Sequence, residues 1–157
     1  MVSLRAMTEK EFRAFLAQDI ETFAAEKVKA GNWAADEALQ RSRDAHDSLL
    51  PQGLSSPDQR LYTIELDGEV VGRLWLSTDP KLGARVGFIY DLFVAEPFRR
   101  RGIGKQAMSL MEKEALRLGL DGLALHVFGH NAAARSFYEQ LGYTITNINM
   151  SKPLSPA

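Results

Sequence analysis

The fold of this chain is decided by residues 90 to 118, which read YDLFVAEPFRRRGIGKQAMSLMEKEALRL. An apolar run rich in strand-forming residues ends at Glu96-Pro97, and a basic turn with two glycines follows. Apolar residues then recur at helical spacing, at Ile103, Ala107, Met111, Ala115 and Leu118. The stretch therefore predicts a strand, a glycine turn and a helix in succession.

The glycine turn predicts a binding site for a phosphate or pyrophosphate. Gly102 and Gly104 carry no side chain that could obstruct a ligand, and the first amides of a helix have no carbonyl partners of their own. The positive end of the helix dipole attracts the same anion. The turn also holds four basic residues: Arg99, Arg100, Arg101 and Lys105. Because glycine turns and arginine runs are also common on solvated surfaces, the turn alone leaves both interpretations open.

Two known nucleotide motifs fit this turn poorly. The mononucleotide P-loop requires Ser or Thr after its Gly-Lys pair, whereas Gln106 follows Gly104-Lys105. The dinucleotide fingerprint fits residues 102 to 107 formally, but it expects an acidic residue at the end of the next strand. That strand is predicted over residues 123 to 128 and is followed by Gly129-His130, with too little chain left for a second nucleotide-binding half.

Two motifs give the chain a resemblance to the GCN5-related N-acetyltransferase superfamily. Residues 99 to 104, Arg-Arg-Arg-Gly-Ile-Gly, match its acyl-coenzyme A signature Arg/Gln-x-x-Gly-x-Gly/Ala. Residues 131 to 143 read NAAARSFYEQLGY and match the pattern Asn-x-x-Ala-x-x-x-Tyr-Glu-x-Leu-Gly-Phe, except that Tyr143 replaces the final Phe. The resemblance covers about residues 61 to 150, and the part before it fits the family's layout without a diagnostic motif.

Composition limits the classes of protein to consider. A length of 157 residues suits a single domain, 1–157, in which residues 152 to 157 are expected to be a frayed tail. Because cysteine is absent, disulfides, thiolate metal sites and a cysteine nucleophile are excluded. The net charge of −1 argues against general affinity for nucleic acid. No run approaches the roughly 18 apolar residues of a membrane span, and we expect a cytoplasmic protein.

The remaining elements follow from capping, periodicity and turn signals. Thr8 to Glu11 fits a capping box, which predicts a helix from there to about Gly31-Asn32. Asp67-Gly68 between two strand-like runs predicts a hairpin. Further strands are expected over 2–7, 61–66, 70–77, 86–94, 123–128 and 143–150, and further helices over 34–50 and from Asn131 to Gly142. The helix over 34–50 should bury Ala35, Ala38, Leu39, Ala45 and Leu49 and leave His46 at the surface.

The resemblance implies an α/β fold, the acyl-CoA N-acyltransferase fold, with a mixed, mostly antiparallel central sheet flanked by helices. It implies a cleft where the central and fifth strands diverge, and acetyl-CoA as the co-substrate. The diphosphate of coenzyme A would contact the backbone amides of residues 101 to 105, including those of Gly102, Ile103 and Gly104. Positive charge beside it would come from Arg99, Arg100, Arg101 and Lys105. The pantetheine arm would pair with Leu92, Phe93 and Val94, although strand residues of this kind are more often simply core. Asn131, Ala134 and Tyr138 share one face of a helix and would meet the same arm, although Asn131 also suits a helix N-cap.

Two residues are candidates for catalysis. By resemblance Tyr138 would donate a proton to the departing thiolate of coenzyme A, whereas without the resemblance it would be an ordinary half-buried aromatic residue. Asp91 interrupts the central strand and should alternate to the face opposite Tyr90, Leu92 and Val94. It is a candidate general base, and a structural ion pair or a relay through water are the alternatives.

The predicted function is acetyl transfer from acetyl-CoA to a primary amine by direct attack in a ternary complex. The acceptor could be a small molecule or a protein, and dimers are frequent among relatives, so a homodimer is one expected state. No metal is expected, because His126 and His130 do not form a His-Glu-x-x-His motif. Two alternatives stay open: an acyl-CoA-binding sensor without turnover, and a nucleic-acid module that uses the arginine triplet.

Overall fold

The central sheet has five strands in the order β1-β2-β3-β4-β5 in the computed structural model, which describes residues 1–156. They are β1 Val2–Ala6, β2 Gln59–Leu66, β3 Glu69–Ser77, β4 Val86–Val94 and β5 Gly122–Leu125. The pairs from β1 to β4 are antiparallel, and β4 pairs with β5 in parallel. The mixed, mostly antiparallel sheet predicted from the sequence is therefore confirmed.

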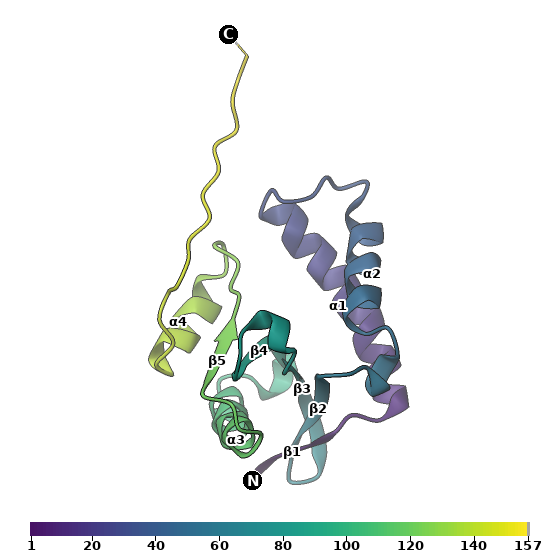
Figure 1. Ribbon diagram of the computed structural model, residues 1–157, viewed down its shortest axis with the longest axis vertical. Coiled ribbons are helices and arrows are strands. Elements are labelled where there is room, and N and C mark those ends of the chain that lie inside the picture. Colours follow the sequence, from purple (N-terminus) through teal and green to yellow (C-terminus); the bar gives the residue numbers. More distant parts are fainter. Residues whose placement is uncertain (157) are drawn as a thin grey trace.

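Helices cover both faces of the sheet (Figure 1). They are α1 Glu9–Lys29, α2 Ala38–Leu49, α3 Ile103–Arg117 and α4 Ala132–Gln140. The capping box at the start of α1 is present, since the Thr8 side chain accepts from the Glu11 amide and the Glu11 side chain accepts from the Thr8 amide. Within residues 1–156, no helix has both the length and the apolar character needed to cross a membrane.

The sheet separates two hydrophobic cores. On one face, α3 places Met108 and Met111 against strand residues such as Ile64 and Leu74, and α4 adds Phe137. On the other face, residues of α1, of the strands and of the chain just after β1 and α2 form the second core: Met7, Phe12, Phe15, Leu50, Leu61 and Trp75. The glycine turn follows the end of β4, and α4 packs on the first of these cores.

A β-bulge in β4 changes the alternation expected from the sequence. Trp75 of β3 pairs with Asp91 and Leu76 pairs with Ile89, so Tyr90 has no partner in the register. The extra residue places Tyr90 and Asp91 on the same side, because Tyr90 packs on Trp75 while Asp91 binds Arg73 beside α1. The prediction that Asp91 faces away from Tyr90 is therefore wrong, although it does face away from Leu92.

Two elements differ from the prediction near the C-terminus. The strand expected over residues 123 to 128 covers Gly122–Leu125 only. The strand expected over 143 to 150 is absent, and this segment has no regular structure. A strand needs a neighbour to complete its hydrogen bonds, and this part of the chain runs away from the sheet toward the C-terminus instead (Figure 1).

The second helix begins four residues later than expected and buries a different face. Residues 35 to 37 form a turn, so α2 begins at Ala38. Its buried positions are Ala38, Ser42 and His46, whereas Leu39 is exposed. The expectation that His46 lies at the surface is therefore wrong: Asp19 and Ser42 supply the hydrogen bonds that allow a buried imidazole.

Candidate functional site

The glycine turn forms a concave loop of backbone at the start of α3. Arg100 and Gly102 both have left-handed backbone angles, with φ of 61° and 76°. A left-handed arginine costs about 1–3 kcal/mol, and alternating left-handed residues turn successive N–H groups toward one point. Gly102 caps α3, but no side chain satisfies the first amides of the helix.

The amides of this loop are free of protein acceptors within the described part of the chain. The Arg99 amide bonds the Glu96 carbonyl at 3.2 Å, and the next amide with a protein acceptor is that of Gln106, which bonds the Gly102 carbonyl at 3.1 Å. The amides of residues 100–105 between them donate to no other group within residues 1–156. These donors and the nearby guanidinium groups make the loop suitable for an anion.

Gly104 permits close packing between two helices. A Cβ atom at this position would lie 3.3 Å from the Phe137 ring of α4 and 3.9 Å from Val94. The absence of a side chain therefore lets α4 pack closely on the first turn of α3. Phe137 packs against the core, and the ring of its neighbour Tyr138 lies beside it with ring centroids 5.0 Å apart.

The last residues of β4 lie next to the glycine turn. Arg99 Nε donates to the Val94 carbonyl at 2.7 Å. The register between β4 and β5 ends at Ile89 and Leu125, so the edge of β4 beyond Ile89 faces no strand within residues 1–156. Leu92 and Val94 lie on this free stretch. The side chain of Phe93 lies elsewhere, with its ring between the guanidinium groups of Arg73 and Arg99, at 4.3 and 5.4 Å.

A cavity of about 180 Å³ opens where β4 and β5 separate. It brings together five of the predicted site residues: Asp91, Leu92, Asn131, Ala134 and Tyr138. Its other lining residues come from the ends of both strands: Ile89, Tyr90, Leu125, His126, Val127 and Phe128. The basic residues of the glycine turn do not line it, and the free edge of β4 runs between the two.

Asp91 belongs to a buried network of charges on the side of the sheet that α1 and α2 cover. Its Oδ2 atom accepts from Arg73 Nε at 2.7 Å. Arg73 also lies 3.9 Å from Asp19, whose Oδ2 atom is 2.7 Å from His46 Nε2. His46 Nδ1 donates to the Ser42 carbonyl at 2.8 Å. Both imidazole nitrogens therefore have partners.

The network sets the proton affinity of its members. Burial raises the pKa of Asp91 to about 6, and the charge of Asp19 adds to this, while Arg73 and His46 oppose it. Burial lowers the pKa of His46, but hydrogen bonds to Asp19 and Ser42 outweigh burial, so the pKa is raised above its usual value. A carboxyl group with a pKa near 6 is ionised at neutral pH yet basic enough to accept a proton.

Sequence reasoning missed Asp19, His46 and Arg73. Each lies in an element that was predicted, but their contact depends on α1 and α2 crossing over β3 and β4. The only local signal is the helical spacing of two polar residues on α2, Ser42 and His46. Without the position of α1, this spacing cannot be distinguished from that of a solvent-exposed polar face.

Asn131 caps the start of α4, and Tyr138 lies in the last turn of this helix. Burial, with the electrostatic influence of Asp91 and Tyr143, raises the pKa of Tyr138, so its hydroxyl group stays protonated at neutral pH. Asn131 Oδ1 accepts from the Ala134 amide at 3.1 Å, which shows that it is the N-cap of α4 as well as part of the cavity wall.

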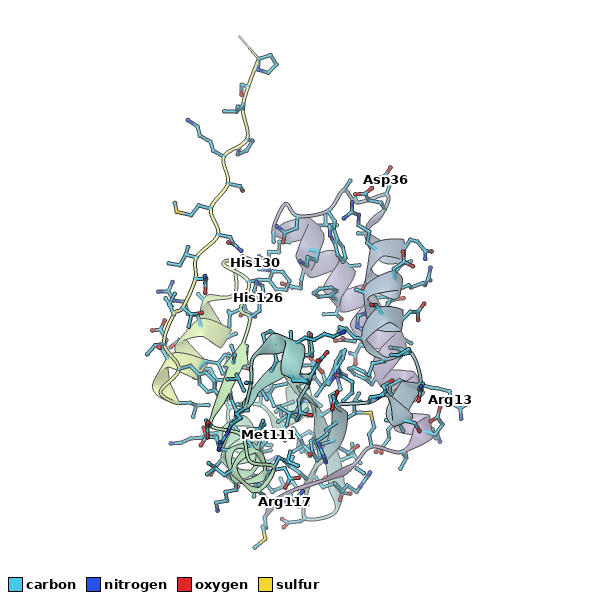
Figure 2. The ribbon with its side chains drawn as sticks, in the orientation of Figure 1. Arg13, Asp36, Met111, Arg117, His126 and His130 are labelled. Carbon is cyan, nitrogen blue, oxygen red and sulfur yellow. The ribbon has the colours of Figure 1, made fainter. Side chains whose placement is uncertain are left out.

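His126 and Phe128 line the cavity, and His130 follows them on the same loop. Phe128 stacks on His130 at 5.5 Å and meets Phe23 of α1 at 6.3 Å. His130 Nε2 contacts Glu26 of α1, and Figure 2 shows His126 and His130 close together on this loop. Burial, together with the charge of Lys27, lowers the pKa of His126. Within residues 1–156, no group of three or more potential ligands could hold a metal ion.

Comparisons with known proteins identify relatives of this fold. The family model "Acetyltransferase (GNAT) family" matches residues 20–143. The uncharacterized N-acetyltransferases YycN and YdgE of Bacillus subtilis are 39% and 38% identical to the chain, over 98% and 97% of it and 99% and 98% of their own lengths. The crystal structure of YycN superimposes with a TM-score of 0.94 over 99% of this chain and 100% of that one. At 18% identity, PaiA N-acetyltransferase of Thermoplasma acidophilum, in complex with coenzyme A, shares the fold with a TM-score of 0.69, over 95% of this chain and 93% of its own.

Proposed function

The chain belongs to the acetyltransferase (GNAT) family and is an N-acetyltransferase, and from this we propose that it moves an acetyl group from acetyl-CoA to a primary amine by direct attack in a ternary complex. The observation that carries the proposal is the cavity between β4 and β5, which Asp91 and Tyr138 line together. The carboxylate of Asp91 has a pKa high enough for it to accept a proton as a general base. The phenol of Tyr138 keeps its proton at neutral pH. These are the two proton-handling groups that amine acetylation needs.

The residues present fit coenzyme A. The free amides of residues 100–105 suit its diphosphate, with charge from Arg100, Arg101 and Lys105. Arg99 acts differently, because its guanidinium group binds the Val94 carbonyl and shapes the end of β4. The free edge of β4 offers backbone groups at Leu92 to the amide-bearing arm of the cofactor, while at Val94 the carbonyl already accepts from Arg99 and only the amide remains for this role. The complex of PaiA with coenzyme A supports this choice of ligand through a shared fold. When bound, acetyl-CoA supplies the activated acetyl group.

Asp91 would accept a proton from the acceptor amine. Keeping a lysine-like amine neutral at pH 7 costs about 4.6 kcal/mol, against about 1.4 kcal/mol or less for an α-amino group. A general base therefore matters more for a lysine-like acceptor than for an α-amino group. The Arg73 bond fixes Asp91 Oδ2 in place, and Oδ1 has no partner within residues 1–156. Asp91 can thus be held by Arg73 and still receive a proton.

Tyr138 would stabilise the departing thiolate by a hydrogen bond. Full proton transfer from a phenol of pKa about 10 to a thiolate of pKa about 8.5 is uphill by about 2 kcal/mol. Burial of Tyr138 increases that difference. Donation of a hydrogen bond as charge develops on sulfur is therefore the role that its environment supports.

The acceptor would enter from the side of α1 and α2. Aromatic rings of Phe23 and Phe128 and the carboxylate of Glu26 border that side, which suits an amine-bearing small molecule or a protein side chain. The net charge of −1 supports a small or peptide acceptor over a nucleic acid.

Replacing Tyr138 by Phe tests the assignment. The variant should lose about 10²-fold in kcat, while its affinity for acetyl-CoA, measured by calorimetry, stays within about twofold. The measurement is the release of free coenzyme A across a panel of primary amines. Tyr62→Phe is the matched control, since Tyr62 is another half-buried tyrosine, away from the cavity, whose buried hydroxyl has no partner within residues 1–156.

The alternatives predict different outcomes. A sensor without turnover would bind acetyl-CoA and release no coenzyme A with any amine. A nucleic-acid module would bind a duplex oligonucleotide with an affinity that falls steeply with salt. Equal losses of binding and rate in Tyr138→Phe would contradict the role proposed for this residue.

A further inference from the structure

The last turns of α1 lie beside the candidate cavity between β4 and β5, on the side from which the acceptor would enter. The ring of Phe23 meets that of Phe128, a residue of the cavity wall, with centroids 6.3 Å apart. Lys27 follows one turn later on the same helix. Burial and, after it, the charge of Lys27 lower the pKa of His126, which is labelled in Figure 2 and also lines the cavity. The positive charge of Lys27 therefore acts on the cavity wall.

Two aromatic rings hold the ammonium group of Lys27 in place. Its Nζ atom lies 5.4 Å from the ring centroid of Phe23 and 5.3 Å from that of Trp33. The two rings meet edge to face with centroids 5.5 Å apart. The chain after α1 folds back to bring Trp33 there, because the amides of Asn32 and Trp33 both donate to the Lys27 carbonyl, at 2.9 and 3.4 Å. The rings attract the cation but give it no counter-charge.

Lys27 has no acidic partner, whereas acidic residues near it are paired. The pairs are Glu26 with His130, Asp19 with His46, and Asp91 with Arg73. Lys27 forms no ion pair within residues 1–156. A helical partner would stand three or four residues away along the chain. Those positions hold no acid, since they are Phe23, Ala24, Ala30 and Gly31. Lys27 therefore keeps a positive charge that a ligand can neutralise.

An acceptor on this path meets different groups at its two ends. Its amine reaches Asp91 in the cavity, and its other end lies toward Lys27. Between them the rings of Phe23 and Phe128 form an apolar border. A second amine would be repelled by Lys27, and a neutral group would leave the charge of Lys27 unpaired. A carboxylate would be attracted to it, because opposite charges in a partly buried site are weakly screened by salt.

We propose that the acceptor is a small amino carboxylate, whose primary amine meets Asp91 while its carboxylate binds the ammonium group of Lys27. The apolar chain between the two groups lies against Phe23 and Phe128. This inference rests on the proposed function, because it places one end of the acceptor at the base of that reaction. The carboxylate takes no part in the acetyl transfer, so Lys27 determines specificity and is not a catalytic residue.

A series of acceptors tests the need for a carboxylate. The series is β-alanine, γ-aminobutyrate, δ-aminovalerate and ε-aminocaproate, each compared with its own carboxamide, which has the same size and no charge. The release of free coenzyme A gives kcat/KM for each compound. At the chain length that spans from Asp91 to Lys27, the carboxylate should exceed its carboxamide by about tenfold, as for a hydrogen bond between charged groups. Equal values within every pair overturn the inference.

Substitutions at Lys27 test which residue recognises the carboxylate. Lys27→Ala should lower kcat/KM about tenfold for the preferred carboxylate and leave that for its carboxamide within about twofold. Lys27→Glu should reverse the preference and favour the diamine of the same length. Lys29→Ala is the matched control, since Lys29 is an exposed lysine in the last turn of the same helix, and it should change neither value. Circular dichroism would show that each variant is folded. An equal loss for carboxylate and carboxamide in Lys27→Ala contradicts the assignment.

A binding measurement separates this inference from the proposed function. Calorimetry with coenzyme A present measures the affinity for each compound without turnover. Wild type should bind the preferred carboxylate about tenfold more tightly than its carboxamide, and Lys27→Ala should remove the difference. This preference in binding, without release of coenzyme A from acetyl-CoA, would refute the catalytic function and leave the carboxylate site in place. Release of coenzyme A with no preference for any carboxylate, in rate or in binding, would leave the function in place and overturn the inference.

Discussion

The two faces of the central sheet bury their side chains in different ways. The face beneath α3 holds an apolar core whose largest fully buried residues include Ile64, Leu74, Met108 and Met111. The face beneath α1 and α2 has an aromatic core, but it also encloses a charged and polar network: Asp19, Ser42, His46, Arg73 and Asp91.

This difference between the two faces suggests that one contributes mainly to stability and the other to reactivity. Apolar packing needs volume and tolerates neighbours of many kinds, whereas a buried charge stays in place only with a fixed partner. The candidate catalytic cavity opens beside the second face, and Asp91 with the charges that set its pKa belongs to that face. We therefore expect changes beneath α3 to alter the free energy of unfolding and changes beneath α1 and α2 to alter rate and pH dependence.

The largest effect should come from Met111→Ala. Met111 lies between α3 and the sheet (Figure 2) and is fully buried, so its truncation leaves a cavity and should cost about 2–5 kcal/mol of unfolding free energy. Urea titration measures this loss. At a temperature where the variant remains folded, the pH dependence of kcat/KM should be unchanged.

Lys113→Ala on the exposed side of the same helix is the control and should stay within about 0.5 kcal/mol of wild type. A Met111→Ala variant that shifts the pH profile of kcat/KM without loss of stability would contradict the different roles assigned to the two faces.

The sequence predicts the parts of this architecture whose signals are local. The Thr8 capping box, the Asp67-Gly68 hairpin and the turn into α3 each depend on a few neighbouring residues, and the structure has all three. The bulge at Tyr90 has no such signal, because it arises from the register with β3.

What sequence reasoning missed depends on contacts between distant segments. The buried face of α2 is polar, since Ser42 Oγ donates to the Ile20 carbonyl at 2.7 Å and His46 meets Asp19. An apolar periodicity cannot reveal such a face. The last strand was expected from its composition, but a strand forms only where another offers an edge. The convergence of Asp91 and Tyr138 on one cavity follows from the separation of β4 and β5, which no motif encodes.

On the face beneath α1 and α2, Asp91→Asn should lower kcat/KM by about 10²-fold at pH 7.5. In the wild type kcat/KM should rise with pH through about 6, as Asp91 loses its proton. The variant should lack this limb of the profile. Because the raised pKa means that the folded state holds this proton more tightly, the contribution of Asp91 to the free energy of unfolding should fall as pH rises from about 4 to 6, and Asp91→Asn should remove this contribution.

Asp44→Asn is the control for Asp91→Asn, because Asp44 is an exposed carboxylate on α2 that bonds only Gln40 within the described residues. It should leave both profiles unchanged. A wild-type limb near pH 6 that persists in Asp91→Asn would assign the proton transfer to another group and favour a relay through water.

The smallest effect should come from His46→Gln, which tests whether the deeper part of the network acts through charge. A histidine whose pKa is raised in the folded state stabilises the protein fully below its unfolded pKa of about 6.5, and this stabilisation is lost as pH rises through the folded pKa. The variant should therefore be less stable than wild type by about 1.5 kcal/mol at pH 5.5, the lower end of the range for a hydrogen bond to a charged group, and by less at pH 8. Urea titrations at the two pH values measure the difference. A loss that is the same at both would mean that His46 contributes shape and hydrogen bonds but no charge, and the contrast between the two faces would then rest on Arg73 and Asp91 alone.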